Sequence, residues 1–285
     1  MASDIGLVLG GGGAKGAYQA GVYKALTELG IAPQIAAFSG TSVGALNAVL
    51  FECRGTEAEE VWLGLKSSDL LHVTPAQLQL LAAGGPANAA VLTMLMGLPF
   101  SQGAVSKLID KYIDFGAVKR PVYVTCLRSK LRLLASPERK AEYFQLNQVY
   151  PWYEPDQQKD MLLASSALPL VYFGLSGARI RGFNDRFFDG GYTDDGDNLP
   201  VRPLYDRGLR KIIAVPLTCE PELEKQQGFE GAEIVNIIPT EDLGGQVTGM
   251  LYLDHDKAEH DIKLGYDDTM LLRRRLLALA ERDIQ

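Results

Sequence analysis

The sequence has few of the residues that build disulfide frameworks, metal centres and membrane spans. Its three cysteines, Cys53, Cys126 and Cys219, are odd in number and widely spaced. We therefore expect neither a disulfide framework nor a zinc ligand set, and we interpret them as reduced core residues. No run reaches the ~20 apolar residues of a membrane span, and no basic segment followed by a long apolar stretch indicates a signal peptide. These absences predict a cytoplasmic chain, at most peripheral to a membrane, with no metal site and no cofactor.

Positive charge is also scarce, since 28 Lys and Arg face 35 Asp and Glu, for a formal net charge of −7. Phosphate binding needs clustered Lys and Arg, so nucleic acid is not expected as a partner. A composition of 47% hydrophobic and 22% charged residues excludes a disordered chain and a collagen-like fibre. We predict a single domain over residues 1–285. Nothing in the sequence indicates its oligomeric state.

Histidine, the usual base of serine hydrolases, occurs only three times, as His72, His255 and His260. His255 could complete a Ser–Asp–His triad in the chain order of α/β-hydrolases. However, His255 and His260 lie in the charged stretch DHDKAEHD, which is typical of an exposed helix start. His72 follows two leucines, and we predict a structural role for it. None of the three histidines is therefore a strong candidate for the base of a nucleophilic serine.

Strand-like and helix-like runs alternate in the first part of the chain. This alternation predicts an α/β fold, a three-layer α/β/α sandwich with a mostly parallel central sheet. We expect a helical insertion or cap over about residues 52–101, because that region contains no strand-like run. The expected strands are 6–9, 35–38, 122–127, 131–134, 187–188, 211–217 and 234–238, and the expected later helices are 104–113, 155–168 and 256–282.

The sequence GTSVG at residues 40–44 matches the G-x-S-x-G nucleophile elbow. It lies between a strand-like run and a helix-like run, as the elbow requires. Gly40 and Gly44 leave space around a tight turn that would present Ser42 at a helix N-terminus. A serine hydroxyl is a poor nucleophile until a base takes its proton. Ser42 is therefore our candidate nucleophile.

The sequence GGGGAKG at residues 10–16 offers backbone N–H groups at a helix start, where an anion is favoured. Gly11, Gly13 and Gly16 also fit a dinucleotide fingerprint. That fingerprint needs an acidic residue after the second strand, whereas the strand here leads into the serine elbow. A P-loop needs Ser or Thr after its lysine, whereas Lys15 is followed by Gly16. We therefore interpret the loop as an oxyanion hole.

In this interpretation the amides of Gly12 and Gly13 face Ser42, and each such donor is worth ~3 kcal/mol in the transition state. Lys15 would anchor the loop or attract an anionic head group, and we favour the anchoring role.

The sequence RFFDGGY at residues 186–192 provides the candidate base, Asp189. Two aromatic residues before it predict apolar surroundings, which raise the pKa of a carboxyl group. Gly190 and Gly191 after it allow a tight turn and a close approach of backbone or substrate. A simple Asp-Gly turn would have the same sequence.

The ordered series GGGGAKG, GTSVG and DGG resembles the patatin-like phospholipase family. ASSALP at residues 164–169 and HDIKLGYDDT at 260–269 resemble further stretches of that family. The resemblance implies a Ser–Asp dyad of Ser42 and Asp189 without histidine, and Gly11, Gly12 and Gly13 in the oxyanion loop. It also implies hydrolysis of lipid acyl esters (phospholipids, lysophospholipids or neutral esters) without calcium.

One departure from the family lies beside the predicted base. Family members often run from DGG to Asn-x-Pro within a few residues, but here Asp194, Asp195, Gly196 and Asp197 come first. This acidic loop either disfavours anionic head groups or points its carboxylates to water.

Other functions share the same motifs. A lipid acyltransferase would use an alcohol or thiol in place of water, and a regulatory lipid-binding module would keep the fold with little catalysis. Residues 89–100, from Ala89 to Phe100, form an apolar stretch that is either a buried helix or a peripheral membrane contact at the lipid entrance.

Overall fold

The computed structural model describes residues 4–70, 103–130, 138–146, 153–167, 177–191, 193–219, 228–245 and 248–281. Its strands are β1 (Ile5–Leu9), β2 (Ile35–Thr41), β3 (Val122–Ser129), β4 (Arg139–Leu146), β5 (Arg186–Asp189), β6 (Lys211–Val215) and β7 (Glu233–Asn236). Its α-helices are α1 (Ala17–Glu28), α2 (Val43–Arg54), α3 (Ala58–Gly64), α4 (Ser67–Leu70), α7 (Gly103–Tyr112), α8 (Pro155–Ser165), α9 (Arg202–Asp206), α10 (Thr248–Leu251), α11 (His255–Leu271) and α12 (Arg273–Glu281). Short 3-10 helices are η1 (Gly13–Gly16), η2 (Ala32–Gln34), η3 (Gly55–Glu57) and η4 (Phe115–Ala117).

The strands form one sheet in the order β4-β3-β2-β1-β6-β7, and β5 also pairs with β3. The pairs along β3-β2-β1-β6-β7 are parallel, whereas β4 and β5 run antiparallel to β3. The central strands are buried on both faces, so β1 and β6 are almost continuously apolar. The predicted mostly parallel α/β sheet is confirmed.

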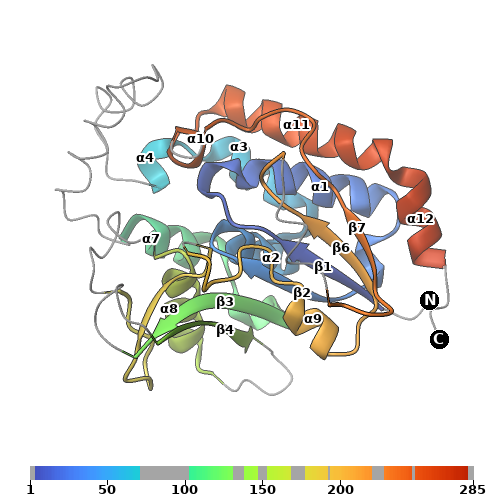
Figure 1. The fold of residues 1–285 in the computed structure, drawn as a ribbon. Helices are drawn as coiled ribbons and strands as arrows, with labels where there is room; N and C mark the ends of the chain where they lie inside the picture. Colours follow the sequence, from blue (N-terminus) through green and yellow to red (C-terminus); the bar gives the residue numbers. More distant parts are fainter. Residues whose placement is uncertain are drawn as a thin grey trace.

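The two helical layers are unequal in size (Figure 1). Leu7 and Leu9 of β1 face a large core that is shared with α1, α2, α8 and α11. Val8, on the opposite face, packs in a small cluster with Leu204 of α9. Among the described helices, therefore, most of the burial that stabilises the sheet lies on one face.

α11 packs along the outer side of α1 (Figure 1). A Cβ built on Gly21 of α1 would lie 1.8 Å from the Ile262 carbonyl oxygen, and one on Gly265 would lie 2.1 Å from the Tyr18 carbonyl oxygen. Both positions need glycine because the two helix backbones are in direct contact.

The structure differs from the sequence predictions in several places, and α9 and α10 are among the elements that were not predicted. The predicted last helix is two helices, α11 and α12, separated at Leu272. β4 was not predicted, because it is an edge strand with three charged residues in its first half and mostly half-buried side chains. Of the cysteines, only Cys126 is buried; Cys53 is half-buried and Cys219 is exposed, and all three are free thiols.

The predicted helical insertion over residues 52–101 is described only as far as residue 70, where it contains the end of α2, η3, α3 and α4. The predicted strand 131–134 and the apolar stretch 89–100 lie outside the described residues. None of the helices in the described ranges is long and apolar enough to cross a bilayer.

Candidate active site

Ser42 lies on the sharp turn between β2 and α2, as the elbow motif predicts. Its backbone has φ 57° and ψ −126°, and it is the only described residue other than glycine with a positive φ. Such a conformation costs ~1–3 kcal/mol and persists only where the surroundings enforce it. A Cβ on Gly44 would lie 2.1 Å from the Leu9 carbonyl oxygen, and one on Gly40 would lie 2.4 Å from the Gly44 carbonyl carbon. The two glycines therefore let β1, β2 and α2 meet closely at this turn.

Ser165, at the end of α8, anchors the elbow. The Ser42 amide donates to Ser165 Oγ at 2.9 Å, and Ser165 Oγ donates to the Thr125 carbonyl of β3 at 2.6 Å. Our sequence reasoning assigned Ser165 no role, although it lies in the ASSALP stretch. The side chain uses both its donor and its acceptor to fix the turn.

Asp189 ends β5 and is only 3% exposed. Its Oδ1 accepts a hydrogen bond from the Gly191 amide at 2.9 Å. Burial raises the pKa of Asp189 to about 6, against partly opposing hydrogen bonds from the Ser42 hydroxyl and the Gly191 amide. Oδ2 is buried without a well-aligned partner among the described residues, so the Ser42 contact is a loose one. Catalytic hydrogen bonds are often long in unliganded enzymes and tighten when substrate binds.

The two side chains meet because both neighbouring strands are aligned on β3. Thr41, just before Ser42, pairs with Thr125, and Asp189 pairs with Cys126, the next residue of β3. β2 pairs with the first half of β3, and β5 pairs with the second half. One short piece of β3 therefore fixes the distance between hydroxyl and carboxylate.

The glycine loop lies beside Ser42, but its amides have different partners. The Gly11 amide donates to the Asn198 carbonyl at 3.3 Å and to Asn198 Oδ1 at 3.2 Å. The Gly11 N–H is thus engaged with Asn198, and the oxyanion-binding role of Gly11 stays a prediction. The amides of Gly12 and Gly13 donate to no acceptor within the described part of the chain. Gly13 also has φ 60°, which favours glycine.

Asn198 joins the glycine loop to the DGG turn. Besides accepting from Gly11, its Oδ1 occupies the space beside Gly191, where a Cβ would lie 2.2 Å from it. A Cβ on Gly190 would lie 2.7 Å from the Thr125 carbonyl oxygen, so this turn packs directly on β3. The only sequence signal for Asn198 was its place in the Asn-x-Pro that follows DGG.

Lys15 and Gly16, at the end of the loop, are buried against other elements. Lys15 is 6% exposed, and its Cε lies where a Cβ on Gly249 would be 2.7 Å away. Burial lowers the pKa of Lys15, and the nearby Asp242 partly offsets this effect. A Cβ on Gly16 would lie 2.5 Å from Val43 Cγ2. These contacts fit the anchoring role that we predicted for Lys15.

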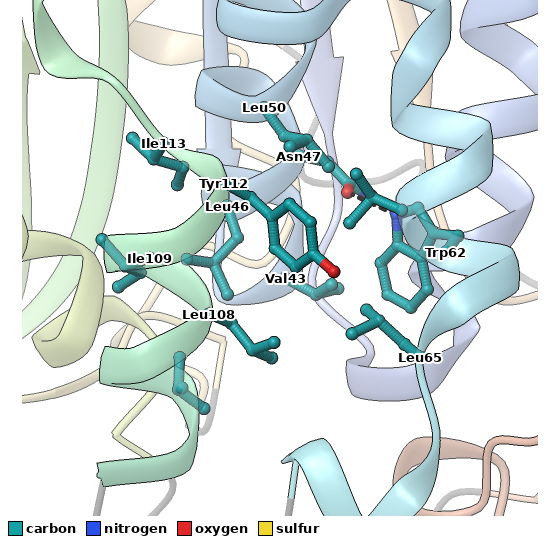
Figure 2. A pocket seen from close by; sticks show the side chains of 12 residues that line it. Val43, Leu46, Asn47, Leu50, Trp62, Leu65, Leu108, Ile109, Tyr112 and Ile113 are labelled. Carbon is teal, nitrogen blue, oxygen red and sulfur yellow. Dashed lines mark hydrogen bonds between the residues drawn. The ribbon is translucent and has the colours of Figure 1, made fainter.

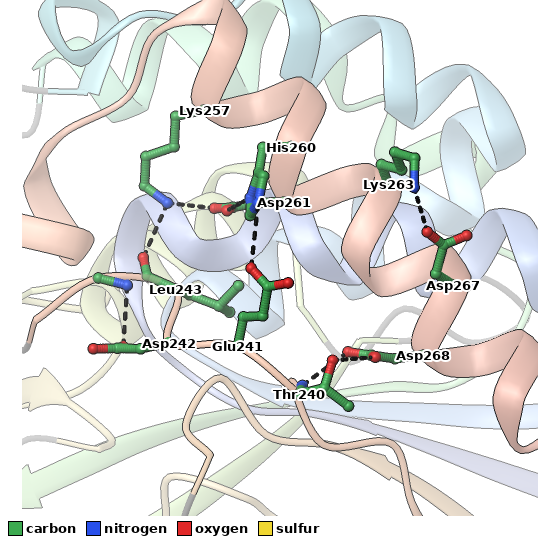
Figure 3. Close-up of polar contacts among 11 residues, drawn as sticks. Thr240, Glu241, Asp242, Leu243, Lys257, His260, Asp261, Lys263, Asp267 and Asp268 are labelled. Carbon is green, nitrogen blue, oxygen red and sulfur yellow. Dashed lines mark hydrogen bonds and ion pairs between the residues drawn. The ribbon is translucent and has the colours of Figure 1, made fainter.

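The stretch HDIKLGYDDT forms a polar network that supports this side of the loop (Figure 3). Asp268 of α11 accepts from the Tyr18 hydroxyl at 3.0 Å and from Thr240 Oγ1 at 2.7 Å. Lys257 donates to Asp261 at 2.5 Å and to the Leu243 carbonyl at 3.0 Å. The network binds α11 to α1 and to the segment that carries Asp242.

The acidic loop after Asp189 is largely bound to β4. Asp195 pairs with Arg139 at 2.6 Å, and Asp197 Oδ2 accepts from the Tyr143 hydroxyl at 2.8 Å. Asp194 is exposed and makes neither of these contacts. Two of these carboxylates therefore hold the loop in place.

The described histidines lie elsewhere. His255 Nδ1 is 3.1 Å from the Leu63 carbonyl oxygen, and exposed His260 contacts Glu241 and Asp261. His72 lies outside the described residues. Across the described ranges, no group of three or more His, Cys, Asp or Glu side chains could hold a metal ion.

A mostly parallel sheet with a strained serine beside a buried aspartate defines a class of α/β proteins that includes serine lipases. Residues 7–205 match the model of the patatin-like phospholipase family, so the chain belongs to that family. The lysophospholipase nte1 of Aspergillus terreus is 57% identical over 48 residues, which are 17% of this chain and 3% of the fungal protein. The chain thus matches only a small part of that relative.

The fold is shared with solved structures, of which two serve as examples. VipD of Legionella pneumophila superposes with a TM-score of 0.51 at 15% identity, covering 96% of this chain and 67% of VipD. The human GIVD cytosolic phospholipase A2 gives a TM-score of 0.56 at 11% identity, covering 97% of this chain and 60% of the human one. At such identities the likeness concerns the fold.

Proposed function

We propose that this chain is a serine acyl hydrolase that cleaves lipid acyl esters with a dyad of Ser42 and Asp189. The observation that carries the proposal is the approach of a strained serine to a buried carboxyl group whose pKa is raised to about 6. Two neighbouring amides, of Gly12 and Gly13, have no acceptor among the described residues. Membership of the patatin-like phospholipase family supports the choice of lipid esters.

In the proposed reaction Ser42 Oγ attacks the ester carbonyl while Asp189 accepts the hydroxyl proton. The amides of Gly12 and Gly13 stabilise the oxyanion that forms on the carbonyl oxygen. Asp189 then gives the proton to the leaving alcohol, and an acyl-enzyme remains on Ser42. Water attacks this ester with Asp189 again as base, which releases the fatty acid and restores both residues.

We propose phospholipids, lysophospholipids or neutral esters as substrates, with no requirement for calcium. In the proposed reaction the raised pKa of Asp189 suits both the acceptance and the return of the proton. A carboxyl with a pKa of about 6 is mainly ionised near neutral pH, yet it is a stronger base than an ordinary aspartate.

The experiment compares p-nitrophenyl butyrate turnover and fluorophosphonate labelling in the wild type, Ser42→Ala and Asp189→Asn. We expect Ser42→Ala to abolish labelling and to lower kcat/KM by ~10³-fold or more. We expect Asp189→Asn to lower kcat/KM by ~10²-fold or more. Circular dichroism checks that each variant is folded. Ser166→Ala is the matched serine control, because the Ser166 hydroxyl donates, among the described residues, to the Leu162 and Leu163 carbonyls of α8.

Other outcomes identify the rival functions. Full turnover by a folded Ser42→Ala variant would end the proposal. Loss of activity in His255→Ala, with Asp189→Asn still active, would indicate the Ser–Asp–His triad. A wild type that resists the probe would indicate a lipid-binding regulatory module, whereas acylated glycerol among the products, when glycerol is added, would indicate an acyltransferase.

A further inference from the structure

An apolar pocket lies between α2, α3 and α7 (Figure 2). Its walls include Leu46 and Leu50 of α2, Val61 of α3 and Leu108 of α7. The space available to the centres of water-sized groups is about 70 Å³. One such group needs ~10–15 Å³, so the pocket has room for roughly five of them.

The few polar groups of the pocket wall are mostly engaged with the protein. The Asn47 amide nitrogen donates to the Gly16 carbonyl and to Gln19 Oε1, each at 2.9 Å. Trp62 Nε1 donates to Asn47 Oδ1 at 2.9 Å. A polar ligand would find few free partners here, whereas an alkyl chain needs none.

One end of the pocket begins one residue after Ser42. Val43, the residue after Ser42, lines it, and Gly16 of the glycine loop packs against both Val43 and Trp62. Because Val43 begins α2 and Leu50 is two turns further on, the pocket extends about 10 Å along the helix. A chain attached to the carbonyl at Ser42 would therefore enter at the first turn of α2.

Tyr112 lies between the apolar pocket and a second cavity. Arg54, at the end of α2, donates through Nε to the Tyr112 carbonyl at 3.2 Å, which fixes this residue at the far end of the helix. The Tyr112 ring points from α7 across the pocket toward Trp62 (Figure 2). Beyond it lies a polar cavity lined by Arg54, Glu57, Glu60 and Lys111, which shares Val61 and Tyr112 with the apolar pocket. An alkyl chain would lose its apolar surroundings there.

We propose that this pocket holds the acyl chain of the ester and that Tyr112 sets the chain length that the enzyme accepts. The inference rests on the proposed function, since it assumes an ester carbonyl at Ser42. In this proposal the face of α2 that lines the pocket selects the acyl group. The alcohol part of the ester lies on the opposite side of the elbow.

The test measures kcat/KM for p-nitrophenyl esters from acetate to palmitate. Tyr112→Ala removes the ring and frees the volume that it occupies beside the apolar pocket, so the longest ester that is turned over well should lengthen by a few carbons. Leu46→Trp and Val61→Phe narrow the pocket, so medium and long esters should lose at least ~10-fold relative to acetate. The matched controls, Tyr266→Ala and Leu277→Trp, change the same residue types away from the pocket and should leave the preference unchanged.

The proposal is overturned if Tyr112→Ala keeps the wild-type limit, or if a narrowing variant that still cleaves acetate keeps the wild-type preference. If both narrowing variants lose acetate turnover as well, the Tyr112→Ala result decides alone.

A binding measurement separates this inference from the proposed function. Trp62 lines the pocket, so a brominated fatty acid bound there should quench tryptophan fluorescence in the inactive Ser42→Ala variant. The quenching should disappear in Ser42→Ala with Trp62→Phe. If the fatty acid quenches the fluorescence but the wild type cleaves no ester, the pocket assignment holds and the proposed hydrolase function is rejected. Turnover without quenching would reject the pocket alone.

Discussion

Ser42 and Asp189 are both held in states that cost folding free energy. Ser42 has a backbone conformation that side chains other than glycine rarely adopt, and Asp189 is a carboxyl group buried away from water. Such costs often occur at functional sites, where the surrounding structure compensates for them. At Ser42 the compensation includes the hydrogen bond to Ser165, and at Asp189 it includes the one from Gly191.

The pH dependence of turnover should report the ionisation of Asp189. Only the carboxylate can accept the proton of Ser42, and its pKa is raised to about 6 by burial. We expect kcat/KM for p-nitrophenyl butyrate to rise with pH through about 6 and to stay level above it, falling ~10-fold per unit on the acid side.

Histidine titrates in the same range, so the profile is repeated with His255→Ala and His260→Ala. An inflection that moves or disappears in either variant would contradict the assignment to Asp189.

Asp189→Asn should be more stable than the wild type although it is inactive. A carboxyl whose pKa is raised from 3.8 to about 6 on folding lowers stability when it is ionised, by up to about 3 kcal/mol at 1.36 kcal/mol per unit. The folded state binds the proton more tightly than the unfolded state does. Tighter proton binding at Asp189 therefore stabilises the folded wild type. This stabilisation is complete below about pH 4 and is lost as pH rises through about 6.

The advantage of Asp189→Asn should accordingly grow between about pH 4 and 6 and then remain constant. Urea unfolding at several pH values measures it. Asp185→Asn is the control, because Asp185 pairs with Arg128 and its loss should give no such gain. An Asp189→Asn variant that is less stable than the wild type at pH 8 would show that the carboxylate is stabilised more than it is desolvated.

Among the secondary-structure elements, α11 has a larger role than its distance from Ser42 suggests. It packs on α1, which follows the glycine loop, and its side chains bind the segment that carries Asp242 near Lys15. α10, just before it, packs on the loop itself, with the Met250 carbonyl oxygen 2.4 Å from where a Cβ on Gly13 would be. These elements lie outside residues 7–205, the part that matches the family.

Gly265→Ala should separate α11 from α1 and destabilise the protein by about 2 kcal/mol or more, because its methyl group meets the Tyr18 backbone. Gly64→Ala is the matched control: no atom lies within 4 Å of a Cβ at this α3 position. We expect that change to be neutral or slightly stabilising. Thermal unfolding compares the two, and equal midpoints would mean that the helices can move apart without cost.

At the scale of the whole molecule, the sequence was sufficient to locate the central strands and to select Ser42 and Asp189 as catalytic candidates. β1, β2 and β6 are short apolar runs followed by turn residues, and Ser42 and Asp189 stand in motifs bounded by glycine. Ser165 and Asn198 could not be assigned in this way. They act through hydrogen bonds to residues 123 and 187 positions away, and no local pattern encodes such contacts.

The apolar pocket was equally inaccessible to sequence reasoning. Its walls come from three helices, and their apolar residues have the spacing of any buried helical face. Whether such faces meet or leave a gap depends on how the helices pack against one another.

The alignment of β2 and β5 on a single strand has a consequence for fragments of this protein. A polypeptide that stopped before residue 186 would retain the complete elbow and the glycine loop, yet it would have no proton acceptor for its serine. A shift of β5 by one position along β3 would turn the carboxylate to the opposite side of the sheet. In the proposed mechanism, ester cleavage therefore depends on the completed seven-stranded sheet.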